Sequence, residues 1–392
     1  MPSTSRTSRG VPATVRILIC ARVVNRIGAF TLPFLAVYLT GNLGASVAQA
    51  GMVLSLFGVA TIPSRIVGGY LADRVGGKAT IVLGLAGCTA CQAWIATVDS
   101  LPAAVVATGL LGLVFEIYEP PTGALIADAM PADRRPQAYS LLGAAMAVAA
   151  VAAGLLAAVI GQWDLRWLFA ADALTCALGA LLVAVGLPRH PQQPRTEQTA
   201  AAPARVWRDT RLLTLLATGT VLATLYLQIP ISLPLTLVER QLPATQLGIL
   251  LAVSALIVVL AQPVLRTRAL REIDSFRALT LGHLLLGAGL FVNGFATSLT
   301  EFVLATITWS LGEALLTGHL TNVVVDMAPR HARSRYLAVH GSSWGIAAAL
   351  APMAGAQLLT ATGPEGLWSM CAVAALALAA VQPALRRWLR RS

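Results

Sequence analysis

Charged side chains are scarce in this sequence: Asp, Glu, Lys and Arg make up 11% of its 392 residues, whereas 57% are hydrophobic. A water-soluble globule of this length has no interior large enough to hide that share of apolar side chains. The scarcity of charge therefore excludes an ordinary soluble domain and predicts that lipid is the solvent for most of the chain.

The sequence also lacks the features that several chemistries require. It contains no phosphate-binding GxxxxGKS or GxxxxGKT loop and no soluble segment large enough to hydrolyse a nucleotide. Its five cysteines lie in apolar segments, and the CxxC of Cys88 and Cys91 has neither the turn nor the further ligands of redox or zinc sites. We expect no enzymatic activity, no cofactor and no metal. The energy for any active process must come from an ion gradient, or the process is passive.

What the sequence has instead is a series of long apolar segments, each near the roughly 20 residues that a helix needs to cross a ~30 Å hydrocarbon core. Helices are the spanning form that such segments allow, because no water satisfies the backbone there. We predict an all-α membrane protein with twelve transmembrane helices, at 14–40, 47–72, 79–98, 102–127, 138–161, 166–186, 212–238, 245–265, 277–297, 302–326, 336–360 and 366–385.

The net charge of +11 is distributed unevenly over the loops. Most basic residues fall on alternate loops; Arg166 and Arg240 are the only two on the loops between, and Arg22, Arg26 and Arg65 lie within segments. This asymmetry follows the positive-inside rule, so we expect a multi-pass protein of the cell membrane with both termini in the cytoplasm. It also argues against a nucleic-acid partner.

A polar stretch rich in Pro, Gln, Ala and Arg interrupts the apolar pattern. It predicts an N-terminal six-helix bundle at 1–186, a cytoplasmic linker at 187–210 and a C-terminal six-helix bundle at 211–392. The two halves share a pattern of polar residues, in which Glu116, Asp128 and Pro131 recur as Glu313, Asp326 and Pro329. Pseudo-symmetric repeats of six helices are typical of one large transporter class.

Residues 69–78, GYLADRVGGK, lie between the second and third predicted helices. Glycines there permit a tight turn, and the basic side chains favour the cytoplasmic face. The decapeptide resembles the loop 2–3 motif of the major facilitator superfamily. The resemblance implies the fold of that family and a role in gating for Gly69, Asp73, Arg74, Gly76, Gly77 and Lys78.

Two further segments resemble the twelve-helix drug:proton antiporters of that superfamily. They are residues 25–35, NRIGAFTLPFL, in the first helix and residues 118–128, YEPPTGALIAD, in the fourth. The fifth helix departs from this group, because residues 143–161 retain Gly143 and Gly154 but no proline. The resemblance implies proton-coupled efflux by alternating access.

Ionisable groups near the bilayer centre usually face a cavity or a partner, because lipid does not solvate them. Arg22 and Arg26 share one face of the first helix, and Glu116 and Glu119 lie at similar depth on the fourth. The family's architecture places these helices around the cavity, which implies that the arginines pair with the glutamates. The sequence leaves open both a static packing role and a binding or coupling role.

Glu313 on the tenth helix differs, because the seventh helix offers Gln228 but no arginine or lysine between residues 212 and 239. A buried carboxylate without a counter-ion favours its neutral form, which suits proton exchange. Glu313 is therefore our leading proton carrier, and Glu116 and Glu119 are further candidates for proton coupling.

The substrate cavity is expected to be lined by polar and aromatic side chains of the central helices: Arg22, Asn25, Arg26, Phe30, Tyr118, Gln228, Trp309 and Thr317. Aromatic residues, among which we also count Tyr226 and Trp344, favour hydrophobic or planar organic cargo, although aromatics on helices more often belong to the core or face lipid.

The sequence thus predicts a monomeric secondary transporter whose partners are the lipid bilayer, a small-molecule substrate and protons, and whose cargo is an amphipathic drug or antibiotic. A second hypothesis is an importer or facilitator of a polar or anionic metabolite, bound directly by the arginine–glutamate cluster. A third, a membrane-embedded enzyme or receptor, conflicts with the intact gating motif.

Overall fold

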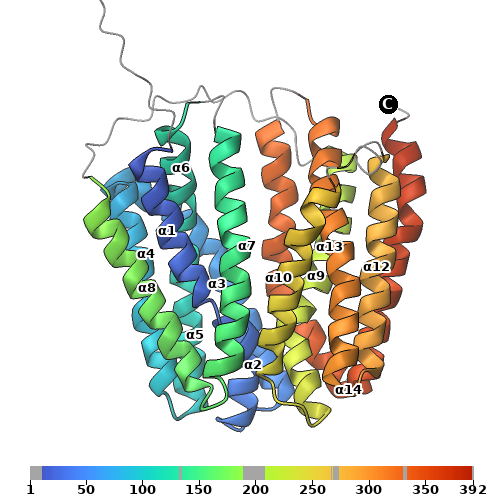
Figure 1. Cartoon of the computed structure of the whole chain (residues 1–392), viewed down its shortest axis with the longest axis horizontal. Coiled ribbons are helices and arrows are strands. Elements are labelled where there is room, and N and C mark those ends of the chain that lie inside the picture. The colour runs from blue at the N-terminus through green and yellow to red at the C-terminus, as the bar shows by residue number, and fades with distance from the viewer. Residues whose placement is uncertain are drawn as a thin grey trace, which may run out of the picture.

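The computed structural model describes residues 11–131, 135–188, 208–265, 267, 273–329 and 333–390, and their regular structure is entirely helical (Figure 1). The helices are α1 (Ala13–Ile27), α2 (Thr31–Gly41), α3 (Val47–Val75), α4 (Gly77–Thr97), α5 (Leu101–Phe115), α6 (Glu119–Ala129), α7 (Arg135–Ile160), α8 (Arg166–Gly186), α9 (Thr210–Glu239), α10 (Gln246–Leu265), α12 (Ser275–Phe295), α13 (Leu299–Met327) and α14 (Arg333–Arg390).

Eleven helical stretches of the described chain are long and apolar enough to cross a membrane, and the last of them runs through α14. The 58 residues of α14 would extend for about 87 Å at ~1.5 Å per residue, far more than one bilayer core. Gly363 breaks this helix with φ 65° and ψ −174°, a conformation that glycine adopts without strain. The chain turns back there, and counting two passes in α14 accounts for the twelve predicted spans.

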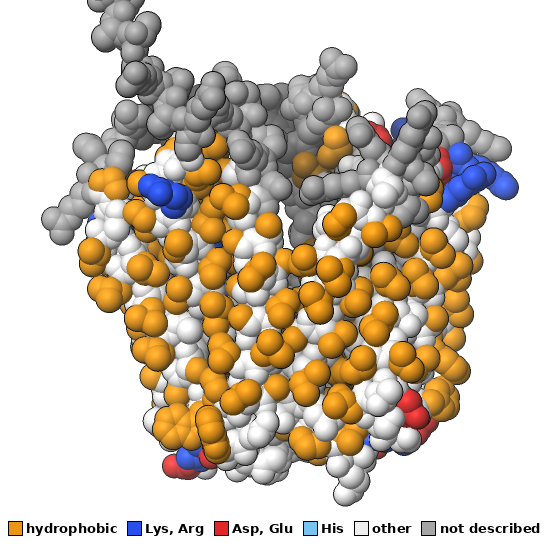
Figure 2. All heavy atoms as spheres, in the orientation of Figure 1, with side chains coloured by type: hydrophobic (Ala, Val, Ile, Leu, Met, Phe, Trp, Pro, Cys, Tyr) orange, Lys and Arg blue, Asp and Glu red, His pale blue; other side chains and the backbone are white. Residues whose placement is uncertain are grey.

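The outer surface matches a lipid environment. On the face that Figure 2 shows, hydrophobic side chains cover the flank of the molecule, whereas the charged side chains in view gather at its two ends. At one end, Arg166 pairs with Asp99 at 2.5 Å and Arg240 pairs with Glu365. These are the two arginines that the charge pattern assigned to the side opposite the termini.

The helices form two groups that lie side by side, α1–α8 and α9–α14 (Figure 1). They meet where α3 packs on α14, α7 on α10 and α2 on α9. A Cβ added to Gly154 of α7 would lie 2.4 Å from the carbonyl oxygen of Gly248 of α10, so the two backbones are in direct contact. Most of the predicted linker, residues 189–207, lies outside the described residues, and the boundaries of the two halves stay a prediction.

Two predicted spans are interrupted near their middle. The first breaks at Gly28–Phe30 between α1 and α2, where a Cβ on Gly28 would lie 1.9 Å from Oγ1 of Thr175 in α8. The fourth breaks at residues 116–118, and Pro120 and Pro121 begin the next helix, where their missing N–H groups leave no hydrogen bond unmade. The two prolines thus follow directly on the break in the fourth span.

Candidate functional site

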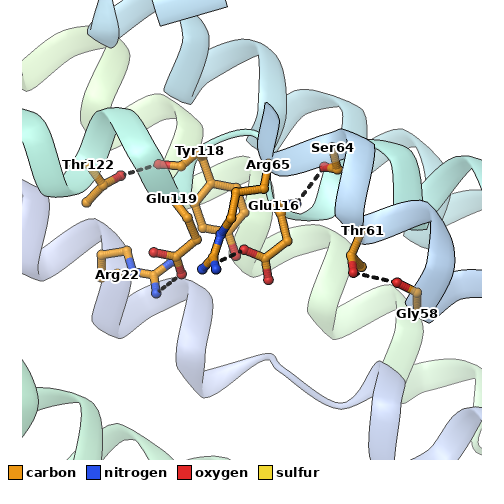
Figure 3. A network of polar contacts seen from close by, with 9 residues as sticks. All are labelled: Arg22, Gly58, Thr61, Ser64, Arg65, Glu116, Tyr118, Glu119 and Thr122. Carbon is orange, nitrogen blue, oxygen red and sulfur yellow. Dashed lines mark hydrogen bonds and ion pairs between the residues drawn. The ribbon is translucent and has the colours of Figure 1, made fainter. Parts of the chain in front are cut away.

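The break in the fourth span presents two carboxylates to two arginines. Figure 3 shows Glu119, the first residue of α6, beside Arg22 of α1, and Glu116 beside Arg65 of α3. The Arg65–Glu116 distance is 3.4 Å, and the Glu116 backbone N–H donates to Oγ of Ser64 at 2.9 Å. The side chains of Arg22 and Glu119 are 17% and 33% exposed, so this pair is shielded from solvent in part.

The predicted partner of Glu116 was wrong in one respect. Arg22 pairs with Glu119 as expected, but Arg26 forms no ion pair within the described residues and its side chain is exposed. Glu116 is neutralised by Arg65 instead, because α3 passes the break in the fourth span on the side away from α1 (Figure 3). Arg26 is thus left as a cation without a carboxylate partner.

Tyr118 connects the ion pairs to the interior of the first half. Arg22 Cζ lies 5.1 Å from the centre of the Tyr118 ring, and the Tyr118 hydroxyl donates to Oδ1 of Asn25 at 3.1 Å. Asn25 in turn donates to the sulfur of Cys176 at 3.2 Å. A small cavity beside Arg22, Asn25 and Tyr118 has room for about one water molecule.

This network continues to a buried carboxylate whose role the sequence analysis did not identify. Asp172 of α8 is 4% exposed and accepts hydrogen bonds from Thr31 Oγ1 at 2.7 Å and from Gln92 Nε2 at 2.8 Å. Cys176 lies 3.6 Å from its other oxygen. Because Thr31 begins α2, Asp172 ties the break in the first span to α4 and α8.

In the second half, Glu313 of α13 forms no ion pair and no side-chain hydrogen bond within the part of the chain that the structure describes. Its backbone carbonyl accepts from Thr317 Oγ1 at 2.9 Å, so Thr317 is satisfied by its own helix. On α9, Tyr226 stacks on Trp344 of α14, with ring centres 6.1 Å apart.

Three side chains assigned to the cavity are used in packing between helices instead. Gln228 donates to the Ala351 carbonyl at 2.8 Å and is 2% exposed, which joins α9 to α14. Trp309 is also 2% exposed. A Cβ added to Gly289 of α12 would lie 2.8 Å from the Cβ of Trp309, so the two helices are in close contact. Phe30 belongs to the hydrophobic core at 2% exposure. All three are buried in this structure, and their assignment to the substrate cavity stays a prediction.

The gating motif forms the turn between α3 and α4. Gly76 has φ 88°, which favours glycine, and Arg74 lies 4.6 Å above the Tyr70 ring. Lys78 donates to the Leu187 carbonyl at the end of α8, and a Cβ on Gly77 would lie 3.2 Å from the side chain of Leu125 of α6. Gly69 has open space around it, and Asp73 is exposed. The motif thus touches the ends of two neighbouring helices, and its gating role stays a prediction.

No cluster of three or more His, Cys, Asp or Glu side chains that could hold a metal ion occurs in the described residues. Two groups of membrane-spanning helices with polar networks at helix breaks define a multi-pass membrane transporter.

The sequence model of the Major Facilitator Superfamily matches residues 18–291 and 231–392. The chain therefore belongs to the Major Facilitator Superfamily.

The chain is similar along most of its length to several bacterial proteins that have different names. The chain is 26% identical over 353 residues to the uncharacterized MFS-type transporter YhjO of Bacillus subtilis, which covers 89% of this chain and 87% of that protein. It is 24% identical to a Na(+), Li(+), K(+)/H(+) antiporter of Planococcus maritimus, over 82% of this chain and 83% of the other. It is 26% identical to the multidrug resistance protein MdtH of Yersinia enterocolitica, over 88% of this chain and 87% of that protein.

Solved structures support the fold. A crystal structure of the peptide transporter POT in complex with sulfate superposes with a TM-score of 0.80 at 17% identity, covering 98% of this chain and 96% of that one. At this identity, the likeness shows the shared architecture and carries no information about cargo.

Proposed function

We propose that this secondary transporter exports a small amphipathic organic molecule in exchange for protons, and that Glu313 is the proton carrier. The observation that supports this proposal is an asymmetry between the halves. In the first half, Glu116 and Glu119 are each held by an arginine. In the second half, Glu313 has no cation partner among the described residues.

A carboxyl group without a counter-ion changes its proton affinity when its surroundings change between apolar and aqueous. In an alternating-access cycle the two halves rock against each other, and the central helices are exposed first to one side and then to the other. Glu313 is placed on one of those helices, so rocking alters its solvation and couples proton uptake and release to the cycle. Glu116 and Glu119 then act as charged supports of the break in the fourth span.

The proposed export rests on the relatives, and the topology assigns the end of the bundle that faces the cytoplasm. One relative is named as a multidrug resistance protein and another as a cation/proton antiporter. Figure 1 shows the C-terminus and the beginning of α1 at the same end of the bundle, as an even number of spans requires. We assign this end to the cytoplasm, where the positive-inside rule puts the arginine-rich loops.

A second candidate function, uptake of a polar or anionic metabolite, is favoured by Arg26. Arg26 as a residue is exposed and forms no ion pair with a carboxylate within the described residues, so it is available to bind an anion. Under this hypothesis, Arg26→Ala abolishes transport of an anionic substrate. Under our proposal, Arg26→Ala leaves transport of a cationic or neutral cargo at the level of the unaltered protein.

The test of proton coupling is transport in proteoliposomes with imposed pH gradients of each sign, measured with lipophilic cations, neutral antibiotics and organic anions. Glu313→Gln should abolish uphill transport driven by the pH gradient. The matched control is Glu239→Gln, because Glu239 is an exposed glutamate at the end of α9. Undiminished uphill transport by Glu313→Gln would refute the proposed role of Glu313.

A further inference from the structure

A row of polar side chains follows one face of α13. It consists of Thr306, Ser310, Glu313 and Thr317, which are spaced by four, three and four residues. Side chains with this spacing are neighbours on a helix surface, with about 5–6 Å between their Cβ atoms. Because α13 begins at the outer end, close to the Arg240 contact with the end of α12, the row runs from the outer part of the helix past Glu313 to its cytoplasmic part.

The burial of this row changes at Glu313. Thr306 and Ser310 on its outer side are 0% exposed, whereas Thr317 on its cytoplasmic side is exposed and Glu313 itself is partly buried. The two halves also touch near the outer end, where Gly154 of α7 meets the backbone of α10. This conformation is therefore closed on the outer side of Glu313 and open on the cytoplasmic side.

The two buried hydroxyls of the row depart from the behaviour of their neighbour. A Ser or Thr hydroxyl within a helix commonly donates to the carbonyl oxygen four residues earlier. Thr308, which lies between them in the chain, does so to Leu304 at 2.8 Å. The hydroxyls of Thr306 and Ser310 have no hydrogen-bond partner among the described residues. Buried polar groups are nearly always hydrogen-bonded, so two hydroxyls without a protein partner point to a ligand.

The spacing of the row favours water as this ligand. An O–H···O hydrogen bond is about 2.5–3.0 Å long, so one bridging molecule with two hydrogen bonds spans side chains whose Cβ atoms are about 5–6 Å apart. A water molecule between Thr306 and Ser310, and another between Ser310 and Glu313, would each have two polar partners, as buried waters require. Because a hydroxyl both donates and accepts, such a chain can pass a proton toward the carboxylate.

The other titratable groups near this face have different neighbours. The helices that pack against α13 are α12, α14 and α10, and α10 carries no Asp, Glu, His, Lys or Arg between residues 246 and 265. His283 of α12 lies 2.6 Å from a carbonyl oxygen of its own helix, His340 of α14 packs against α9, and His319 of α13 lies 3.5 Å from a hydroxyl of α12. The charged groups of α12 and α14 lie near the helix ends or the turn within α14. Glu313 is thus the acidic group to which the row leads.

We propose that Thr306 and Ser310 line a water route through which Glu313 exchanges protons with the outer side when the halves part at that end. This inference rests on the proposed function, in which Glu313 carries the proton, and adds the path that the proton takes. After the halves rock, the carboxylate accepts a proton from a hydronium ion that the outer side supplies, and a water molecule remains. In the present conformation the carboxyl group releases that proton to water on the cytoplasmic side, past Thr317.

Cysteine labelling tests whether water reaches the row from outside. Thr306→Cys, Ser310→Cys and Thr308→Cys are made one at a time in a protein whose native cysteines are replaced. Intact cells are then treated with an anionic methanethiosulfonate that does not cross the membrane. We expect the first two variants to react faster than the third, because Thr308 is two residues, or about 200° of helix rotation, away from each of them. In the present conformation Thr308 is the most exposed of the three positions, so this order requires opening at the outer end.

Removal of the hydroxyls tests whether the route carries protons. The assay is transport driven by an outside-acid pH gradient in proteoliposomes, with whichever lipophilic cation, neutral antibiotic or organic anion the unaltered protein moves. Thr306→Val and Ser310→Ala should each lower the rate by about 2- to 12-fold, the weight of one hydrogen bond. Thr306→Ser and Ser310→Thr keep the hydroxyl and should restore the rate. Exchange of labelled for unlabelled cargo at equal pH moves no net proton and should stay unchanged.

The first half supplies a matched control. Thr108 of α5 is also 0% exposed, and its hydroxyl also has no partner among the described residues. The glutamate that follows it in the fourth span, Glu116, is held by Arg65. Thr108→Val should therefore leave the rate driven by the pH gradient at the level of the unaltered protein.

The outcomes separate this route from the proposed function. If Thr306→Cys and Ser310→Cys react no faster than Thr308→Cys, the route is overturned. An unchanged rate in both Thr306→Val and Ser310→Ala overturns it as well, even if Glu313→Gln abolishes transport driven by the pH gradient. If the two cysteines react from outside but no compound moves with a pH gradient, the proposed proton coupling fails and the route is refuted as a path for protons.

Discussion

Replacing Gly154 by alanine should push the two halves apart at the end opposite the termini. The added Cβ would lie 2.4 Å from the Gly248 carbonyl oxygen and 2.7 Å from the backbone nitrogen of Ala252, both on α10. Backbone atoms cannot rotate away as a flexible side chain does. Ordinary contact begins near 3.4 Å, so α7 and α10 must separate by about 1 Å.

The size of the effect follows from the cost of overpacking, typically about 1–3 kcal/mol. A conformation in which α7 and α10 are apart does not have this cost. The equilibrium between the conformation with the two helices in contact and the one with them apart should therefore shift by about 5- to 150-fold toward the second. Gly143→Ala is a control on the same helix, because a Cβ on Gly143 meets nothing within 4 Å. Both substitutions raise helix propensity equally.

The assay is a distance measurement by electron paramagnetic resonance between two spin labels, one in each half. Trp163→Cys and Ala361→Cys provide exposed sites at the end where α7 and the first pass of α14 finish, in a protein whose native cysteines are replaced. We expect a longer distance to gain population in Gly154→Ala and not in Gly143→Ala. Identical distance distributions in the two variants would show that the α7–α10 contact does not hold the halves closed.

Other predictions concern the ion pairs and the buried carboxylate of the first half. Arg22→Ala should lower the free energy of unfolding by about 1–3 kcal/mol, because the partly buried Glu119 loses its partner. The double variant Arg22→Glu with Glu119→Arg should recover part of the lost free energy, and no recovery would contradict a direct ion pair. Asp172→Ala should lower the melting temperature more than Asp172→Asn, which keeps one acceptor for its neighbours; equal values would mean that its hydrogen bonds contribute little.

The spans and the overall architecture could be predicted from the sequence, because they depend on local composition. Each span needs only enough consecutive apolar residues to cross the hydrocarbon core of the bilayer. For example, the predicted segments that end at residue 360 and begin at residue 366 lie on either side of Gly363, where α14 turns back. The motif at residues 69–78 was informative for the same reason, since its glycines and basic residues act within one turn.

The contacts of the candidate site could be predicted only in part. Arg22 and Glu119 were paired correctly, because spacing and depth bring them to the same level of neighbouring helices. The pairing of Arg65 with Glu116 and of Gln92 with Asp172 could not be predicted, since the partners lie on different helices whose relative rotation the sequence does not show. The stacking of Tyr226 on Trp344 was equally hidden, although both rings were among the aromatic candidates.

The amino-acid sequence by itself predicted an all-helical membrane protein with about a dozen spans, and it indicated the family to which the chain belongs, because hydropathy and short motifs act over neighbouring residues. Only the tertiary structure decided that Arg65 rather than Arg26 neutralises Glu116 and that Trp309 is buried. The physical reason is that helices which are apolar on all sides carry no periodic pattern to set their rotation, so packing against other helices selects the faces that meet.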